Sequence, residues 1–449
     1  MHTDGRFLDL PDRDQMRVFA PSLRQAVAED QELLALDAAV DQLDLSALEA
    51  DYVQVGRPAF PPRALLKIHI YGYSLGLRSS RSLDRACRYD DAFRFLAHGL
   101  RPDFHTLCRF RRRHAAQFEA LFVQIVRRCQ AAGLVSLGHV AIDGSKLRAN
   151  RSKRGLGLAL AELRLALAEA EAADGELPAE VTAAEEARFM KTREGVAPAY
   201  NAQIAVDGDH QVIVAQQVRT EAVDQGLLGE MVAQVVENCG GAPEKVSADG
   251  GYLTEADVAR LDAGPSELHL PCKVSGAREA RRYEWVAEPG AYRCPAGKWL
   301  QPYRRRRGCW IYRTDECAGC AHAKQCGVQG QSKEVHVPLP ETARGRLAQR
   351  MASAAGQAVY ERRKQIVEPV FGRFKHNWGV RRLLLRGRSG AQAEWTLLCL
   401  AHNLGKLLQA GSESPAGSGP GCGWRFFARL FWLHSTYTQA GGGAVTARA

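Results

Sequence analysis

The stretch of sequence that decides the fold is HVAIDGSKLRAN, residues 139–150. Its apolar part, VAID, ends on Asp143 and is followed directly by Gly144. Val and Ile at this density predict a β-strand, and the Asp-Gly pair predicts a turn at its end. A strand that ends in this way holds a carboxylate rigidly at the edge of a sheet, with room for a ligand. A single Asp-Gly at a strand end is more often only a turn, so Asp143 needs support from elsewhere in the chain.

Similar apolar runs on the C-terminal side complete a sheet. YNAQIAVD (200–207) and QVIVAQQV (211–218) predict two more strands, and DQGLLGEMVAQVVENC (224–239) predicts an amphipathic helix. KVSADGGYL (245–253) predicts a fourth strand that ends on Asp249 before two glycines, and SELHLPCK (266–273) predicts a fifth. Strands followed by alternating strand and helix indicate the α/β class, with a mixed sheet covered by helices. Two strands of one sheet that both end on Asp-Gly are harder to explain as turns alone.

A third acidic residue, Glu368, lies in a long basic helical pattern, YERRKQIVEPVFGRFKHNWG (360–379). We expect Pro369 to kink this helix or to start a new segment. Their spacing of three to four or seven to eight residues places four residues roughly along one face of this helix, namely Tyr360, Arg363 or Lys364, Glu368 and Lys375. If that face packs against the sheet, Glu368 is carried toward the two aspartates. The alternative for Glu368 is an ion pair with Arg363, Lys364 or Arg373.

Three carboxylates from separate elements match the needs of phosphoryl chemistry. Mg²⁺ and Mn²⁺ take oxygen ligands. Two such ions, about 4 Å apart, can activate an attacking oxygen and stabilise the leaving oxygen of an in-line displacement at phosphorus. Cations on the neighbouring helix would bind the phosphates and offset the developing negative charge. We therefore expect Asp143, Asp249 and Glu368 to hold two catalytic metal ions.

The charge of the chain points to a polyanionic partner. Its 449 residues are 46% hydrophobic and 24% charged, as in globular proteins, and carry a formal net charge of +10. Between Glu341 and Arg388, twelve Lys or Arg residues stand against three acids. Such a concentration favours a phosphate-binding face. The sequence has neither a membrane-span pattern nor a signal-peptide pattern, so we expect a cytoplasmic protein that joins the nucleoid when it binds DNA.

The N-terminal part is expected to be a helical unit that binds DNA. Apolar residues from Arg63 to Ala97 have helical spacing, in short helices broken at glycines such as Gly72. In RPDFHTLCRFRRRH (101–114), Asp103 is the predicted N-cap of a basic helix. The residues expected to contact the DNA backbone are Arg109, Arg111, Arg112 and Arg113. The alternative is a solvated basic face without a partner.

Composition divides the chain into five regions. They are a helical, DNA-binding unit at 1–135, the first part of a catalytic domain at 136–271 with a helical insertion at about 155–190, a Cys-rich insertion at 272–335, the completion of the catalytic domain at 336–410, and a linker and variable tail at 411–449. The Cys-rich insertion has neither helical nor strand periodicity. Long helical patterns are expected from about 342 to 378 and from 391 to 408.

Clustered cysteines suggest a structural metal in the Cys-rich insertion. The cluster consists of Cys294, Cys317, Cys320 and Cys326. A C-x-x-C pair can place two thiolates on one Zn²⁺, and the other two cysteines can complete a tetrahedron. Reduced free thiols are the alternative, because the second half is not a regular C-x-x-C pair. The same region interleaves Arg304 to Arg307 with Trp and Tyr, a pattern that either binds DNA or packs a small core.

The order of these motifs resembles the DDE transposases of bacterial insertion sequences. The resemblance rests on VAIDGSKLRAN, MKTREG…YNAQIAVD, SADGGY, Y-x-x-R and E-P-x-F-G-x-x-K, with PDFHTLCRFRRRH at the N-terminal side, and spans about residues 10 to 408. It implies a ribonuclease H-like fold shared with retroviral integrases and metal ligands at Asp143, Asp249 and Glu368. It also implies DNA contacts from Tyr360, Arg363 and Lys375. Arg363 lies five residues before Glu368, one more than the commonest spacing.

The resemblance further implies a reaction and its partners. Metal-dependent hydrolysis at the terminal inverted repeats would be followed by attack of the freed 3′-OH on target DNA, without a covalent protein–DNA intermediate. Bringing two DNA ends together leads us to expect a homodimer or a larger assembly. Two alternatives stay open, namely a nuclease of the same fold that does not join DNA, and a DNA-binding protein with a decayed catalytic domain.

Overall fold

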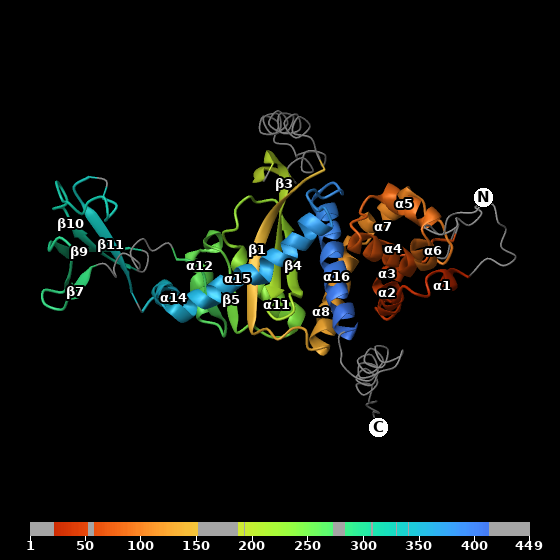
Figure 1. The fold of residues 1–449 in the computed structure, drawn as a ribbon, viewed down its shortest axis with the longest axis horizontal. Helices are drawn as coiled ribbons and strands as arrows, with labels where there is room; N and C mark the ends of the chain where they lie inside the picture. The colour runs from red at the N-terminus through yellow and green to blue at the C-terminus, as the bar shows by residue number, and fades with distance from the viewer. Residues whose placement is uncertain are drawn as a thin grey trace, which may run out of the picture.

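The chain folds around a mixed sheet that is flanked by helices (Figure 1). The structure is a computed structural model, and it describes residues 22–52, 58–150, 187–192, 194–272, 283–306, 309–328, 330–339 and 341–412. Helices in these ranges are all too short or too polar to cross a membrane. Nearly all of the predicted tail at 411–449, and most of the predicted insertion at about 155–190, lie outside the described residues.

The main sheet confirms the predicted α/β class with mixed strand directions. Its strands are β1 (His139–Arg148), β2 (Arg188–Thr192), β3 (Gly195–Asp207), β4 (Ile213–Arg219), β5 (Lys245–Ser247) and β6 (Glu267–His269). Their order is β2-β3-β1-β5-β6, and β4 also pairs with β3. β1 runs antiparallel to β3 and parallel to β5. β2 was not predicted, and it begins where the expected helical insertion ends.

Helices form the described N-terminal part, as predicted. They are α1 (Leu23–Ala26), α2 (Gln31–Asp41), α3 (Ser46–Glu49), α4 (Pro62–Ser74), α5 (Ser80–Tyr89), α6 (Asp91–Leu96), α7 (Phe104–Arg113) and α8 (Ala115–Ala131). The Asp103 side chain caps α7 by accepting from the Thr106 N–H at 2.7 Å. The predicted break at Gly72 is wrong, because α4 runs through it. A Cβ at Gly72 would overlap the Leu83 side chain, so this glycine allows close helix packing.

Further helices flank the sheet. They are α11 (Leu227–Cys239), the 3-10 turn η1 (Gly250–Tyr252), α12 (Glu255–Asp262), α14 (Ala343–Ala352), α15 (Ala354–Gly372), the π-helical turn η2 (Arg373–Asn377) and α16 (Arg388–Ser412). The helical pattern predicted from about 342 to 378 is divided at Ser353, whose side chain caps α15. α15 continues through Pro369 to Gly372, so the proline does not start a new segment.

The Cys-rich region is a second, antiparallel sheet, which its lack of periodicity did not predict. Its strands are β7 (Glu284–Val286), β8 (Ala291–Arg293), β9 (Trp299–Arg306), β10 (Cys309–Thr314) and β11 (Lys333–Pro338). β7 and β8 have three residues each, and β9 contains Pro302 and three arginines. Strands that are this short or this polar give no clear period-2 signal, so the sheet could not be predicted from periodicity.

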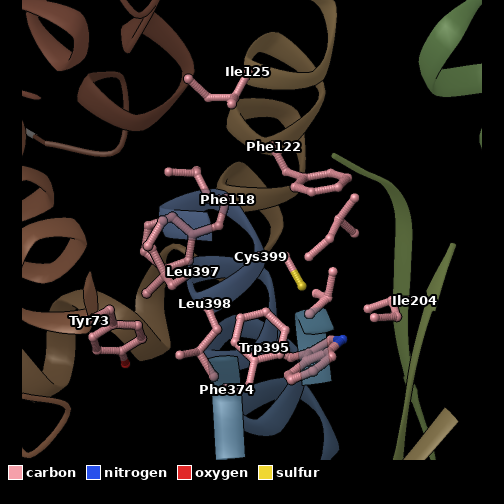
Figure 2. Close-up of a cluster of buried hydrophobic side chains, with 14 of the residues drawn as sticks. Tyr73, Phe118, Phe122, Ile125, Ile204, Phe374, Trp395, Leu397, Leu398 and Cys399 are labelled. Atoms are coloured by element: carbon pink, nitrogen blue, oxygen red, sulfur yellow. The ribbon is translucent and has the colours of Figure 1, made fainter. Parts of the chain in front are cut away.

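Helix α16 lies between the N-terminal helices and the main sheet (Figure 1). Trp395, fully buried, is its largest core side chain, and its indole N–H donates to the Gln203 carbonyl at 3.1 Å. Figure 2 shows side chains from α16 meeting Phe118 and Phe122 of α8 on one side and Ile204 of β3 on the other. The N-terminal helices and the sheet thus share one apolar core.

Candidate active site

Asp143 lies in the middle of β1 rather than at its end. β1 continues to Arg148, so the expected turn at Gly144 is wrong. Gly144 lies opposite Gln203 on β3, and a Cβ at Gly144 would overlap the amide nitrogen of Gln203. The glycine therefore makes room for a neighbouring side chain. Asp143 has 26% of its side chain exposed, and its Oδ1 accepts from the Gly144 N–H at 2.8 Å.

Asp249 follows β5 and begins a glycine turn, in line with the prediction. It is the N-cap of η1, and its Oδ1 accepts from the Gly251 N–H at 2.6 Å. A Cβ on Gly251 would lie only 2.8 Å from that same oxygen. Gly251 therefore leaves the space that the Asp249 carboxylate occupies.

The strand register brings Asp143 and Asp249 to the same part of the sheet. Ala141 of β1 lies opposite Ser247 of the parallel strand β5, and each aspartate stands two residues further along. Neighbouring strands are roughly 4.8 Å apart. Burial raises the pKa of Asp143, the Arg363 guanidinium opposes this shift, and the charge of Asp249 adds to it. The two carboxylates are thus close enough to influence each other.

Arg363 and Glu368 of α15 have different surroundings. Arg363 is 8% exposed, and its Nη1 lies 3.2 Å from Asp143 Oδ2. The Glu368 side chain is exposed and has no hydrogen bond or ion pair among the described residues. Five residues turn an α-helix by about 500°, so these two side chains lie roughly 140° apart around the axis. The prediction that Arg363 and Glu368 share a face is therefore wrong, and the exposed Lys364 is the cation on the Glu368 side.

Asp143 and Asp249 are the predicted ligands that the fold brings together. They offer the hard oxygen donors that a divalent cation needs. Over the described ranges, no three His, Cys, Asp or Glu side chains are grouped closely enough to hold a metal ion. Glu368 stands apart from the aspartates. The alternative of an ion pair between Glu368 and Arg363 does not apply either, because Arg363 pairs with Asp143.

One acidic residue of this region was missed by sequence reasoning. Asp224, between β4 and α11, accepts hydrogen bonds from Lys146, Asn201 and Gln203. Only the motif YNAQIAVD, which contains Asn201 and Gln203, hinted at polar side chains in an otherwise apolar strand. Asp224 itself was assigned to the start of a helix.

The basic helix α7 separates its arginines by exposure. Arg111 is 2% exposed and donates to the Tyr73 hydroxyl, the Arg78 carbonyl and the Ser80 hydroxyl. The expected DNA contact of Arg111 is therefore wrong, because the residue is part of the interior. Arg113 is exposed, donates to the Asp51 carbonyl and lies 5.1 Å from the Tyr52 ring centroid. Arg109 and Arg112 are exposed, without an ion pair in the described part of the chain.

The remaining signature residues lie along the same C-terminal helices. Tyr360 is half-buried, with the Arg363 guanidinium 5.6 Å from its ring centroid. Lys375, in η2, places its Nζ 5.4 Å from the Phe371 ring centroid. Tyr360 therefore lies on the helix that carries Glu368, and Lys375 lies in the turn that follows it.

Two family models match the chain. The one described as Transposase DDE domain matches residues 293–408, and the one described as Transposase domain matches residues 21–113. The chain is a DDE transposase of the insertion-sequence type. Its function is DNA transposition. A search of curated proteins returned no match.

The two matches cover different parts of the transposase. The DDE match runs from the end of β8 to α16 and includes Glu368, Arg363 and Lys375. The other match runs from α1 to α7 and includes Arg109 and Arg112. Asp143 on β1 and Asp249 at the start of η1 lie between the two matches, so neither match covers them.

The Cys-rich part of the transposase gathers its clustered cysteines around one small cavity. Its lining includes Cys294, Cys317, Cys320, Cys326 and His322. The backbone N–H of Lys298 donates to the Cys294 sulfur at 3.2 Å. Burial raises the pKa of the Cys317 thiol, and the other three thiols raise it further. All four cysteines are free of disulfide bonds.

Aromatic residues of this small sheet serve in two ways. Tyr312 is 7% exposed and belongs to its core. Tyr303 is 52% exposed, and the guanidinium groups of Arg304 and Arg313 each lie 5.1 Å from its ring centroid. Tyr312 therefore fits the packing alternative, whereas DNA binding by Tyr303 and its arginines stays a prediction.

Proposed function

We propose that this transposase cleaves DNA at the ends of an insertion sequence and joins the freed 3′-OH to target DNA. The observation that carries the proposal is the pair Asp143 and Asp249, whose carboxylates adjacent parallel strands hold close together. Glu368 is proposed as the third carboxylate. Its side chain is exposed and unpaired within the described part of the chain, and α15 would have to turn when DNA binds for Glu368 to join the pair, because Glu368 lies roughly 140° from Arg363 around the helix.

Hard oxygen donors favour Mg²⁺ or Mn²⁺ as the divalent cation at this site, and two ions are proposed. When bound, such a pair activates the attacking oxygen and stabilises the leaving oxygen at phosphorus. The chain's own contribution is to orient the ligands. The Gly144 N–H donates to Asp143 and the Gly251 N–H donates to Asp249, so a backbone donor fixes the position of each carboxylate.

Arg363 is proposed to change partners during the reaction. Its guanidinium pairs with Asp143, while its Nε is buried without a hydrogen-bond partner among the described residues. A buried donor without a partner is costly, and a phosphate offers two acceptor oxygens in the fork geometry of a guanidinium. Arg363 would therefore release Asp143 and bind the scissile phosphate.

The DNA path is proposed to follow exposed arginines of α7 and two half-buried residues, Tyr360 of α15 and Lys375 of η2. Arg109 and Arg112 lie one turn apart on α7 and are proposed to contact the DNA backbone, with Arg113 beside them. Tyr360 and Lys375 are proposed to contact DNA near Glu368. Salt dependence measures such contacts, since each lost phosphate contact reduces the slope of log affinity against log salt by roughly 0.9.

A ribonuclease H-like core is the proposed architecture, divided into the five regions given by composition. The antiparallel β4-β3-β1 pairing, continued by parallel β5 and β6, supports it. A homodimer or larger assembly, with both terminal inverted repeats bound, is proposed because joining requires two DNA ends. We propose that the transposase is cytoplasmic and joins the nucleoid when it binds DNA.

Cleavage of DNA that carries the element's own ends tests the proposal. We expect nicking that needs Mg²⁺ or Mn²⁺, is lost in Asp143→Asn, Asp249→Ala and Glu368→Gln, and is kept in the control Asp84→Asn on α5. DNA binding should survive in all variants. Joined products in the wild type would support strand transfer, whereas cleavage alone would indicate a nuclease. Full activity of any of the three site variants would refute that ligand.

We further propose that Cys294, Cys317, Cys320 and Cys326 bind one structural Zn²⁺. The four thiols line one cavity, which supports the proposal. No three of them stand at metal-binding distances among the described residues, so binding would have to draw them inward. Tetrahedral Zn²⁺ with thiolate ligands is the usual staple of a small unit with little core.

Metal analysis of the purified protein tests the zinc site. We expect about one Zn²⁺ per chain, released by Cys317→Ser or Cys320→Ser and kept in the control Cys87→Ser, whose thiol is buried in α5. Protein isolated without chelators and free of zinc would rule the site out and favour reduced thiols.

A further inference from the structure

Asp224 accepts more hydrogen bonds than a surface carboxylate needs. Its Oδ1 accepts from Asn201 Nδ2 at 2.7 Å and from Gln203 Nε2 at 2.8 Å, and Lys146 Nζ lies 3.2 Å from both of its oxygens. Only 18% of its side chain is exposed. These donors come from two neighbouring strands, whereas Asp224 belongs to the loop that enters α11. The carboxylate therefore fixes side chains that are distant in sequence.

The network lies on the face of the sheet opposite to Asp143. Side chains alternate along a strand, and residues paired across two strands share a face. Gly144 pairs with Gln203 and Lys146 pairs with Asn201, so these residues lie together on one face while Asp143 points to the other. Asp224 is therefore not a ligand beside Asp143, and it acts on the proposed metal site from the other face of the sheet.

A chain of hydrogen bonds leads from Asp224 to Asp249. The Gln203 amide donates its N–H to Asp224, which leaves its carbonyl oxygen to accept from the Tyr252 hydroxyl. Tyr252 is fully buried and is the last residue of η1, the turn that Asp249 caps. Asp224 also approaches this turn directly, since its Oδ2 would lie 3.8 Å from a Cβ on Gly251. The orientation of the Gln203 amide thus sets the position of η1, because η1 is bonded to this amide through the Tyr252 hydroxyl.

The same network is joined to the strand of Asp143. Lys146 is three residues after Asp143 on β1, and Gln203 occupies the space that the missing Cβ of Gly144 leaves. One carboxylate, Asp224, therefore connects β1, β3 and η1. These are the elements that set the distance between Asp143 and Asp249.

We infer that Asp224 is a positioning residue, which orients Gln203 and Lys146 so that Tyr252 holds the turn of Asp249 beside Asp143. The inference rests on the proposed role of Asp143 and Asp249 in metal binding. It also gives a physical reason for three sequence motifs, because Lys146, Gln203 and Tyr252 belong to VAIDGSKLRAN, YNAQIAVD and SADGGY.

The test compares Asp224→Asn and Tyr252→Phe with the wild type. Each variant keeps the size of its side chain and breaks one step of the network. Both should raise the metal concentration for half-maximal DNA cleavage by about tenfold and weaken Mn²⁺ binding, measured by calorimetry, to a similar extent, as for other residues that orient metal ligands. Affinity for DNA should stay unchanged. Asp84→Asn on α5 is the matched control and should leave the metal requirement unchanged.

Two outcomes separate this inference from the proposed function. Variants with a lowered melting temperature but a wild-type metal requirement would show a merely structural role and overturn the inference. If Asp143→Asn still cleaves DNA with a wild-type metal requirement, the proposed site itself fails. Tyr252→Phe keeps the test decisive should Asp224→Asn not fold, since it removes only one hydroxyl.

Discussion

Gly144 and Gly251 each follow an aspartate of the proposed site, and each leaves space that a neighbouring group fills. At Gly144 the neighbour is the Gln203 amide, and at Gly251 it is the Asp249 carboxylate itself. Neither position has the positive φ that usually explains a glycine. At this scale, both glycines are steric requirements of a packed polar network, and Gly251 also belongs to a turn.

Substitution Gly144→Ala should displace the Gln203 amide and break its bonds to Asp224 and Tyr252. Two such bonds contribute about 2 kcal/mol, so unfolding should become easier by that amount and cleavage should decrease. Denaturant unfolding and the cleavage assay measure both effects. Gly138→Ala is the control, because a Cβ there makes only an ordinary contact at 3.5 Å. If Gly144→Ala lowered the free energy of unfolding by the same amount in a Gln203→Ala variant, which has no amide to displace, the steric explanation would be contradicted.

The raised pKa of Asp143 predicts the direction in which metal affinity changes with pH. A carboxyl with a raised pKa becomes protonated at a higher pH than an ordinary Asp, whose pKa is 3.8. Protons compete with a metal for the ionised form. The affinity for Mn²⁺ should therefore decrease as the pH falls, and the decrease should begin at a pH above the ordinary Asp pKa of 3.8. Calorimetric titrations from about pH 7 to about pH 4.5 measure this affinity. Constant affinity over this range would show that Asp143 does not titrate with metal binding.

At the scale of elements, α15 is held to the sheet although Pro369 interrupts its hydrogen bonds. Pro369 has no N–H, so the Gln365 carbonyl loses its intrahelical donor. Gln211, in the turn between β3 and β4, supplies a replacement through its Nε2 at 3.1 Å. The carbonyl of the same Gln211 accepts from His402 of α16 at 2.9 Å. One turn residue thus connects the sheet with both C-terminal helices.

Removing the Gln211 side chain should therefore loosen α15. Gln211→Ala leaves the Gln365 carbonyl without a protein donor and should lower the free energy of unfolding by about 1 kcal/mol. Denaturant unfolding measures this change in free energy. Amide hydrogen exchange, measured by mass spectrometry, should become faster in α15 than in the wild type, and by more than in β1. The control Gln331→Ala, whose side chain is exposed, should change neither quantity. Unchanged protection of α15 in Gln211→Ala would contradict this role.

Local patterns predicted the elements that depend on nearby residues, and missed those that depend on distant ones. Asp103 was predicted as a cap because its partner is three residues away. Arg111 was expected to contact DNA, yet it is buried because its partners Tyr73 and Ser80 come from other helices. Asp224 is meaningful only once β1 and β3 are side by side. The strands with Asp143 and Asp249 were recognised, whereas the side on which Glu368 lies depends on how α15 packs.

For the whole molecule, a buried ion pair connects the N-terminal helices with the C-terminal part. Arg78 Nη1 lies 2.8 Å from Glu394 Oε1, and Glu394 of α16 is fully buried. Glu394 also accepts from the N–H groups of Leu384 and Leu385. Arg78 donates to the Arg382 carbonyl in the same segment. The proposed DNA-binding helices are therefore fastened to the strands and helices of the proposed active site.

Arg78→Ala should separate these two parts of the transposase. Removing one partner of a buried pair leaves an uncompensated charge on Glu394 and costs about 3–5 kcal/mol. We expect a lower melting temperature and faster proteolysis between α8 and β1. DNA cleavage should decrease by more than the loss of DNA affinity accounts for. Arg88→Ala, which breaks a pair with Asp84 at the surface, is the matched control and should change little. Adding Glu394→Gln should restore part of the stability, because it removes the unpaired charge. Equal losses in Arg78→Ala and Arg88→Ala would mean that the buried pair does not couple the DNA-binding helices to the catalytic core.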